Sequence, residues 1–582
     1  MSSNEESIEG IIKIIALKNA AEYNGKARVE TVIAKAFAAR QDLRGSVKSL
    51  LPKIKAIVHD INLLSSVEQQ ALLEEIAPDE EKKVEVQSHQ RSTSIQKLPP
   101  LPSAVLGQVV TRFPPEPNGY PHIGHAKAAI IDEEYARMYN GKLILRFDDT
   151  NPLNEKEEYY DAILEGLEWL RVRPNIVKNT SDDILKLHEL GKKLVQLDGA
   201  YVCTCSQTTI HDLRSKGLPC QCRADSNTSL ELLQKMFDGS FDKNAAIIRF
   251  KGEMADQNTA MRDPTLFRII DADHPKLGTR IRVWPTYDFA SPIEDSLDGV
   301  SHAMRTKEYE LRNELYFEIL DRLGLQKPFM MEFSRLELDG IPVSKRKIKP
   351  LVENGMVKSW DDPRLPTLMG FKRRGFLPES IREFVLTLGL TLAETKPPFE
   401  ALEALNRKRL DPQSMRLFFV KNPVELCVQN GIPKEVILKN HPNSELGIRR
   451  LRVSSSFFIP QEDAEKFSIG DEFRLIELYN LKLVEKQSKN NKLVLIATVT
   501  GDEVRQDMPK IQWVAKNDIV PYQVIIPKHL YVGEEYNTKS LEIAEGFAES
   551  FVSTLQPDTR IQFVRFGFCR IDGNHKAIFT HK

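Results

Sequence analysis

Two histidines spaced three residues apart are the side chains of this sequence with the clearest chemical potential. His122 and His125 follow a turn rich in proline and glycine, between an apolar run at 106–113 and an amphipathic run at 126–139. A strand, a tight turn and a helix start form an anion site, because unpaired N–H groups at the helix N-terminus face the ligand. The histidines share one face of the first helical turn. Gly124 between them lets a flat ring approach the backbone.

A second candidate is a Ser-Lys-Arg sequence further along the chain. Ser344, Lys345 and Arg346 follow a strand-like run at 333–338 and a turn. When an α-phosphate is attacked, negative charge builds on the pyrophosphate leaving group. A mobile ammonium stabilises that charge more in the transition state than in the ground state. A basic surface loop is the alternative for these three residues alone, but their pairing with the two histidines favours the catalytic interpretation.

Four cysteines form a paired pattern. Cys203-x-Cys205 and Cys220-x-Cys222 are separated by 14 residues. Paired thiols in a cytosolic protein predict tetrahedral coordination of zinc, although this spacing is tighter than the usual Cys-x-x-Cys. Unliganded thiols and a disulfide or redox pair are the alternatives. Because the cysteines lie away from the histidine turn, the expected zinc is structural.

Length and composition limit the elements that can position these groups. At about 150 residues per domain, 582 residues predict three to five domains, and 41% hydrophobic residues suffice for real cores. The net charge is −1, so any nucleic-acid surface must be local. The candidate surface is 342–375, with nine lysines and arginines against three acidic residues, and a solvated charged face is the alternative. No apolar run of 18 residues and no signal peptide occur, so we expect a cytoplasmic protein without a membrane span.

The expected secondary structure changes three times along the chain. Residues 1–100 read as a helical module and linker, and 101–350 alternate between strand-like and helix-like runs, as in a doubly wound α/β sheet with an insertion at about 195–280. Residues 351–414 are mostly helical, and 415–582 contain short β-rich runs that predict β-barrels. The expected strands of the α/β region are 142–147, 247–250, 279–284 and 330–333.

These segments resemble class I aminoacyl-tRNA synthetases, in the glutamyl/glutaminyl branch of archaeal and eukaryotic type and most like the archaeal members. The histidine turn resembles the HIGH signature, and the Ser-Lys-Arg sequence resembles the KMSKS loop, although Pro342 and Val343 depart from it. The resemblance covers about residues 105–580. It implies a Rossmann-like catalytic domain with a zinc-knuckle insertion, a helical segment that contacts the tRNA stem, and anticodon-binding β-barrels, preceded by the N-terminal helical bundle.

The resemblance also implies roles for individual residues. The residues that it places in catalysis are His122, His125 and Lys345. Those that it places at ATP are His122, Gly124, His125, Ser344, Lys345 and Arg346. Those that it places at the substrate amino acid are Arg112, Asp148, Tyr287 and Arg305.

Arg305 favours glutamate as the substrate. Glutamyl members pair arginine with the side-chain carboxylate, whereas glutaminyl relatives generally carry a small neutral residue at the place of Arg305, and Arg112 offers a second fork. The implied enzyme is a monomer that uses ATP and Mg²⁺ to attach glutamate to tRNA-Glu, with tRNA-Gln left open as a further substrate. The N-terminal module would contact tRNA or a protein. A glutaminyl enzyme and a non-catalytic RNA-binding protein of synthetase descent are the alternatives.

Overall fold

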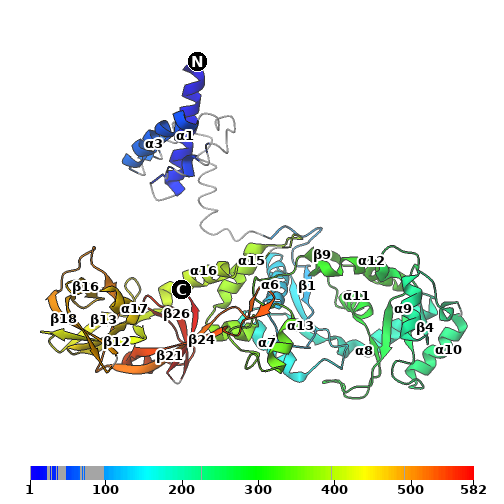
Figure 1. Cartoon of the computed structure of the whole chain (residues 1–582). Helices are drawn as coiled ribbons and strands as arrows, with labels where there is room; N and C mark the ends of the chain where they lie inside the picture. Colours follow the sequence, from blue (N-terminus) through cyan, green and yellow to red (C-terminus); the bar gives the residue numbers. More distant parts are fainter. Residues whose placement is uncertain are drawn as a thin grey trace. The chain divides into compact units, whose positions relative to one another are not determined.

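The computed structural model of the chain divides into two units, residues 1–97 and 98–582, and we describe each by itself. The structure describes residues 2–22, 26–27, 29, 31–33, 36, 47–65, 68–69, 71–72, 76, 98–224, 226–394, 396–490, 492–573 and 575–582. The first unit contains α1 (Ser2–Glu22) and α3 (Val47–Leu63), labelled in Figure 1. Both helices bury apolar side chains that recur at helical spacing. Most of the expected linker lies outside the described residues.

The second unit opens with parallel strands joined by helices. The strands are β1 (Val110–Phe113), β2 (Lys142–Phe147), β3 (Ile176–Asn179), β8 (His302–Thr306) and β9 (Phe329–Phe333). The first three pair in the order β1-β2-β3, and β8 pairs with β9. The Ser301 N–H donates to the Val110 carbonyl (3.0 Å), so β8 lies beside β1. The connecting helices α6 (Ile123–Met138) and α7 (Glu157–Trp169) complete the expected α/β arrangement.

The insertion differs from the sequence-based expectation. Its strands are β4 (Ala200–Cys203), β5 (Ile247–Phe250), β6 (Thr265–Ile269) and β7 (Val283–Pro285), which form an antiparallel sheet. The runs 247–250 and 279–284 therefore do not join the parallel sheet, and only the last two residues of the second run lie in a strand. No crossover helix separates β5, β6 and β7, and strands joined in that way pair antiparallel. Helices α8 (Ile184–Gln196) and α10 (Ser226–Phe237) pack in the same core.

The segment after the α/β region is helical, as expected. Its helices are α13 (Lys345–Glu353), α14 (Leu368–Arg374), α15 (Pro378–Leu388) and α16 (Phe399–Leu410). Three arginines of the basic segment 342–375 are bound within the protein: Arg364 pairs with Asp362 (2.8 Å), Arg373 with Asp572 (3.1 Å) and Arg374 with Glu403 (3.0 Å). These three arginines make contacts within the fold, so fewer basic side chains of 342–375 remain for a nucleic acid.

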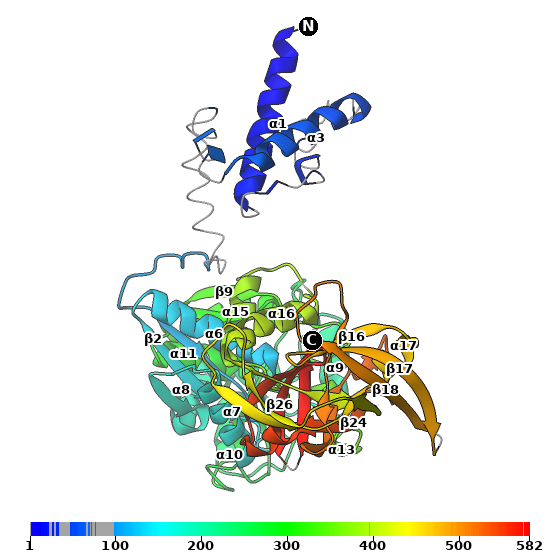
Figure 2. The same ribbon diagram turned by 90° about the vertical axis from the view of Figure 1, so that its left-hand side faces the viewer.

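The C-terminal region contains two seven-stranded, barrel-like sheets, yellow to red in Figure 2, and two short two-stranded sheets, β13 (Lys434–Lys439) with β14 (Ile448–Val453) and β22 (Tyr531–Val532) with β23 (Glu535–Tyr536). One has the order β10 (Met415–Leu417), β25 (Arg560–Phe563), β26 (Gly567–Gly573), β27 (Lys576–His581), β21 (Ile519–Pro527), β24 (Leu541–Glu549) and β11 (Phe419–Lys421). The other has the order β19 (Lys510–Ile511), β16 (Glu472–Leu475), β17 (Asn480–Lys489), β18 (Lys492–Gly501), β12 (Pro423–Gln429), β15 (Ser456–Pro460) and β20 (Val514–Ala515). Among the described helices of the chain, none is long and apolar enough to cross a membrane.

Candidate active site

The two histidines lie at the start of α6, where they cap the helix. His122 is the N-cap residue, and its Nδ1 accepts the Gly124 N–H (3.0 Å). The Nδ1 of His125 accepts the His122 N–H (3.2 Å), and the two ring centroids lie 4.0 Å apart. A Cβ at Gly124 would lie 2.8 Å from the His122 ring, so any residue larger than glycine would clash with the ring in this position. Each neutral ring therefore carries its proton on Nε2.

The surroundings keep both imidazoles uncharged. Burial lowers the pKa of His125 to about 4. Burial also lowers the pKa of His122, and the neighbouring ring and Arg335 add to that shift. The pair can therefore donate hydrogen bonds to phosphate at neutral pH without carrying charge.

The second motif lies close to the histidine turn. Ser344 is the N-cap of α13 and Lys345 is its first residue. The Lys345 side chain packs against Gly119 of the turn. A Cβ atom at position 119 would lie 3.5 Å from Lys345 Cδ. Burial lowers the pKa of Lys345. Ser344 lines an adjoining groove, and Arg346 is exposed, so of the three residues Lys345 lies closest to the histidine turn.

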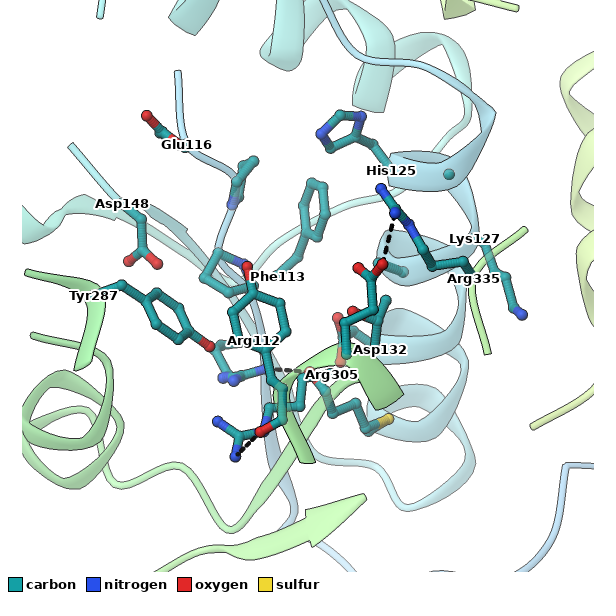
Figure 3. Close-up of a pocket in the computed structure, with 18 of the residues that line it drawn as sticks. Arg112, Phe113, Glu116, His125, Lys127, Asp132, Asp148, Tyr287, Arg305 and Arg335 are labelled. Atoms are coloured by element: carbon teal, nitrogen blue, oxygen red, sulfur yellow. Dashed lines mark hydrogen bonds and ion pairs between the residues drawn. The ribbon is translucent and has the colours of Figure 1, made fainter. Parts of the chain in front are cut away.

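A cavity of about 450 Å³ extends from the two histidines to Asp148, Tyr287 and Arg305. Seven of the predicted site residues line it, namely Arg112, His122, Gly124, His125, Asp148, Tyr287 and Arg305. Figure 3 shows Asp148 and Tyr287 on the wall opposite His125, with Arg112 and Arg305 between the two walls. The predicted residues that do not line it are Ser344, Lys345 and Arg346.

Arg112 is a buried arginine that already has partners. Its Nε lies 3.0 Å from Asp295 Oδ1, and its Nη1 donates to the Met304 carbonyl (2.6 Å). Arg146 also reaches Asp295, at 2.8 Å. Although burial opposes it, these two guanidinium groups lower the pKa of Asp295 and keep it ionised. Two of the three guanidinium nitrogens of Arg112 are therefore bound within the protein, which leaves only part of the expected second fork for a ligand.

Arg305 differs from Arg112 in having no acidic partner among the described residues. Its Nη2 donates to the Tyr309 carbonyl (3.3 Å), and its buried Nε has no hydrogen-bond partner in the part of the chain that the structure describes. The guanidinium lies 5.3 Å from the centre of the Tyr316 ring. The nearby carboxylate of Glu308 pairs instead with Arg335 (2.6 Å). The cavity therefore contains a buried guanidinium whose charge an incoming carboxylate would balance.

Asp148 is one of four acidic residues that line the cavity, together with Glu116, Asp132 and Glu308. Its Oδ1 accepts the Thr180 hydroxyl (3.1 Å) and lies 3.5 Å from Arg146 Nε. Burial raises the pKa of Asp148, while Arg146 opposes that shift. A substrate ammonium would favour the ionised form in the same way. Tyr287 packs on Tyr309, with ring centroids 4.9 Å apart.

Sequence reasoning missed further residues of the cavity. Lys127 lies two residues after His125 and donates to the Ser334 carbonyl (2.6 Å), and burial lowers its pKa to about 8. Lys127 lies in the first two turns of the helix expected after His125, and this position could have indicated from the sequence that it lies near the cavity. Arg268, from β6 of the insertion, also lines the cavity, and its buried Nε has no hydrogen-bond partner among the described residues. No local pattern marks it.

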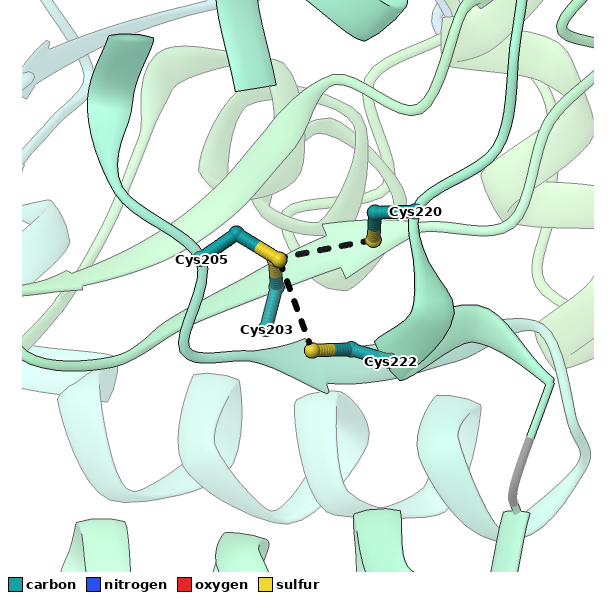
Figure 4. A group of neighbouring side chains, drawn as sticks. All are labelled: Cys203, Cys205, Cys220 and Cys222. Atoms are coloured by element: carbon teal, nitrogen blue, oxygen red, sulfur yellow. Dashed lines mark hydrogen bonds between the residues drawn. The ribbon is translucent and has the colours of Figure 1, made fainter. Parts of the chain in front are cut away.

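The four cysteines come together in the insertion (Figure 4). Their sulfur atoms all lie within 4.8 Å of one another, with Cys203 and Cys220 3.8 Å apart and Cys205 and Cys222 3.7 Å apart. No disulfide joins them. Four Zn–S bonds of about 2.3 Å in a tetrahedron place the sulfurs about 3.8 Å apart. The sulfur positions therefore fit a tetrahedral metal ion.

Arg249 and Tyr201 flank this cysteine cluster. Arg249 Nη1 donates to Cys220 Sγ (3.5 Å), and the Tyr201 hydroxyl lies 3.4 Å from the same sulfur. A cation and a hydroxyl beside a thiolate stabilise its charge, which suits metal coordination.

Comparison with known proteins covers nearly the whole chain. Residues 108–412 match the catalytic domain of tRNA synthetases class I (E and Q), and residues 414–500 and 510–572 match two anticodon-binding domains of the same group. A glutamate–tRNA ligase of Cenarchaeum symbiosum is 47% identical over 575 residues, 99% of each chain. Those of Nitrosopumilus maritimus and Korarchaeum cryptofilum are 45% and 37% identical, over 99% of this chain and 100% and 99% of theirs.

Proposed function

The chain belongs to the class I tRNA synthetases for glutamate and glutamine, and on that premise we propose that it ligates L-glutamate to tRNA-Glu. Arg305 is the observation that carries the choice of glutamate. Its buried guanidinium has no acidic partner among the described residues, and a glutamine amide would leave that charge unbalanced. The relatives' name, glutamate–tRNA ligase, supports the same choice.

The amino acid binds at the end of the cavity that contains Arg305. Asp148 holds the substrate ammonium, and Tyr287 contacts the amino acid with its phenol. Arg305 receives the side-chain carboxylate, and Arg112 adds its remaining nitrogen. This arrangement leaves the α-carboxylate of glutamate directed toward the histidine end.

The reaction then proceeds in two steps. A carboxylate oxygen attacks the α-phosphorus of ATP, and the bond to the β-phosphate breaks to release pyrophosphate. The terminal ribose hydroxyl of tRNA next attacks the acyl carbon and releases AMP. His122 and His125 donate hydrogen bonds to the phosphates, and Lys345 stabilises the charge on the leaving pyrophosphate. Mg²⁺ bound with ATP would neutralise part of the phosphate charge.

Charging assays test this function. Purified protein is given tRNA-Glu or tRNA-Gln together with glutamate or glutamine. We expect glutamate to be attached to tRNA-Glu, and the tRNA-Gln arm decides whether a second tRNA is accepted. Glutamine attachment in place of glutamate would establish the glutaminyl alternative. A protein that charges neither tRNA and catalyses no ATP–pyrophosphate exchange with tRNA present would be the non-catalytic alternative.

The cysteine cluster is proposed as a structural zinc site of the insertion. The sulfur separations and the flanking Arg249 support it. We expect one zinc per chain in protein purified without added metal, and its loss in a Cys203→Ser/Cys205→Ser variant. Metal content by mass spectrometry checks this, and absence of metal from both proteins would leave the cysteines as packing residues.

Residues 1–100 are proposed as an accessory module and linker, followed by the catalytic domain (101–350), a stem-contact segment (351–414) and the anticodon-binding region (415–582). All proposed site residues belong to the second unit, which supports an accessory role for the first. A protein that begins at residue 98 should fold and form glutamyl-adenylate, with a higher KM for tRNA if the module contacts it. A truncated protein that does not fold would contradict the proposed boundary.

A further inference from the structure

We propose that His274, in the loop between β6 and β7 of the insertion, is a positioning residue for the amino-acid end of the active site. The proposal rests on the proposed function, because it concerns the pocket that receives glutamate. His274 does not line the cavity, and its side chain is fully buried behind the wall that carries Asp148. It would act by fixing the backbone that follows Asp148.

The imidazole of His274 reaches out of the insertion to the end of β2. Its Nε2 donates to the Asp149 carbonyl at 3.0 Å and lies 3.1 Å from Glu155 Oε2. That carboxylate oxygen is buried and has no hydrogen-bond donor of good geometry among the described residues. The other oxygen of Glu155 accepts the Asn151 N–H (2.6 Å). One imidazole N–H thus faces the Asp149 carbonyl and Glu155 Oε2, and Asp149 Oδ2 lies a little further away at 3.5 Å.

The other side of the ring fixes which nitrogen carries the proton. Nδ1 accepts the backbone N–H groups of Lys276 (3.1 Å) and Leu277 (3.2 Å). An atom that accepts two hydrogen bonds has no place for a proton of its own, so the proton is on Nε2. His274 therefore ties a tight turn of the insertion on one side and directs its single N–H at the active-site segment on the other.

The segment that His274 contacts carries three residues of the cavity wall, Asp148, Thr150 and Asn151. The carboxylate of Asp149 accepts hydrogen bonds from the Tyr160 hydroxyl (2.9 Å) and the Ser181 hydroxyl (2.7 Å), and its Oδ2 also lies 3.5 Å from His274 Nε2. The backbone between Asp148 and Thr150 is thus held by hydrogen bonds from the α/β domain to the Asp149 side chain and by the hydrogen bond from the insertion to the Asp149 carbonyl. Loss of the second contact would let Asp148 shift relative to Arg305, and small misplacements of binding groups weaken binding strongly.

The experiment must separate positioning from stability, because His274 also stacks on Trp284 (centroids 4.9 Å apart) inside the insertion core. Two substitutions divide the functions of the ring. His274→Asn keeps an acceptor near the place of Nδ1 for the N–H groups of Lys276 and Leu277. It removes the Nε2–H that reaches the Asp149 carbonyl. His274→Gln can return an amide N–H to the place of Nε2. Steady-state charging of tRNA-Glu with varied glutamate measures kcat and KM for each variant.

We expect His274→Asn to raise the KM for glutamate about tenfold, while kcat and the KM for ATP change by less than about threefold. His274→Gln should bring the glutamate KM back to within about threefold of wild type. His188→Asn is the matched control. His188 is a buried histidine of α8, which packs in the insertion core, and it donates to the Val283 carbonyl (2.7 Å) and does not line the cavity. It should lower the melting temperature and leave the glutamate KM unchanged.

The outcomes are distinct. Equal glutamate KM values in His274→Asn and His274→Gln, or a fall in kcat alone, would overturn the positioning role and leave His274 as a core residue. A rise in glutamate KM with His188→Asn would show that any weakening of the insertion has this effect, which would also overturn it. If wild-type protein charges no glutamate, the proposed function fails before His274 is tested.

Discussion

The two ends of the active-site cavity handle charge in opposite ways. At the end proposed for the amino acid, Arg112 and Arg146 share the carboxylate of Asp295, whereas no acid of the described residues pairs with Arg305. At the end proposed for the nucleotide, burial keeps His122 and His125 neutral, and the nearest cation of the two motifs is Lys345 at the start of α13.

This difference separates recognition from rate. A fixed charge that lacks one partner selects a ligand that brings the opposite charge, because both partners lose their hydration on binding. Neutral donors and a cation at a helix start suit charge that develops only as pyrophosphate leaves. We therefore expect substitutions at the amino-acid end to change which substrate is used, and substitutions at the nucleotide end to change how fast it reacts.

The largest effect is expected for Arg305→Cys. Removal of one partner of a buried ion pair costs about 3–5 kcal/mol, so kcat/KM for glutamate should fall by about two to four orders of magnitude. ATP binding should change little, and charging with glutamine should become detectable. Charging assays with both amino acids measure this. Arg305→Lys is the matched variant, because it keeps the charge but not the planar fork. Its kcat/KM for glutamate should lie between those of wild type and Arg305→Cys. Glutamate charging at wild-type efficiency by Arg305→Cys would remove Arg305 from the pocket and revive the glutaminyl alternative.

A smaller effect is expected for Lys345→Ala. Loss of a contact of about 3 kcal/mol to the leaving pyrophosphate should lower the activation rate about 100-fold and leave glutamate binding largely intact. Pre-steady-state formation of glutamyl-adenylate measures the rate. Lys349→Ala is the control, since Lys349 lies on the same helix and pairs at the surface with Glu353 (3.4 Å). A near-normal rate for Lys345→Ala would exclude Lys345 from the mechanism.

The smallest effect is expected for pH at the nucleotide end. An imidazole whose pKa is about 4 stays neutral from pH 8 to pH 6, so the KM for ATP should change by less than about twofold over that range. The unfolded chain protonates its histidines near pH 6.5, so His125 makes the folded state less stable as pH falls from about 6.5 to about 4. An ATP KM that titrates near pH 6.5 in wild type but not in His125→Gln would contradict a neutral pair.

The sequence by itself determined the features whose cause lies within a few residues. The turn before His122, the strand at 142–147 and the paired cysteines follow from turn chemistry, an apolar run and ligand spacing, and the structure has the turn, the strand and a compact sulfur cluster there. The resemblance of these motifs to a family was enough to indicate the domains that the family comparisons match.

Only the tertiary structure decided which charges are already balanced. Arg112 and Arg305 look alike in the sequence, yet Asp295 binds Arg112 from 183 residues away, and no described acid does the same for Arg305. The direction of the strands in the insertion and the contact of His274 with Asp149 were equally hidden. Local patterns report the hydrogen bonds and periodicity of neighbouring residues. Ion pairs and strand pairings between distant residues depend on how the elements pack, and one sequence without its fold does not encode that in any local pattern.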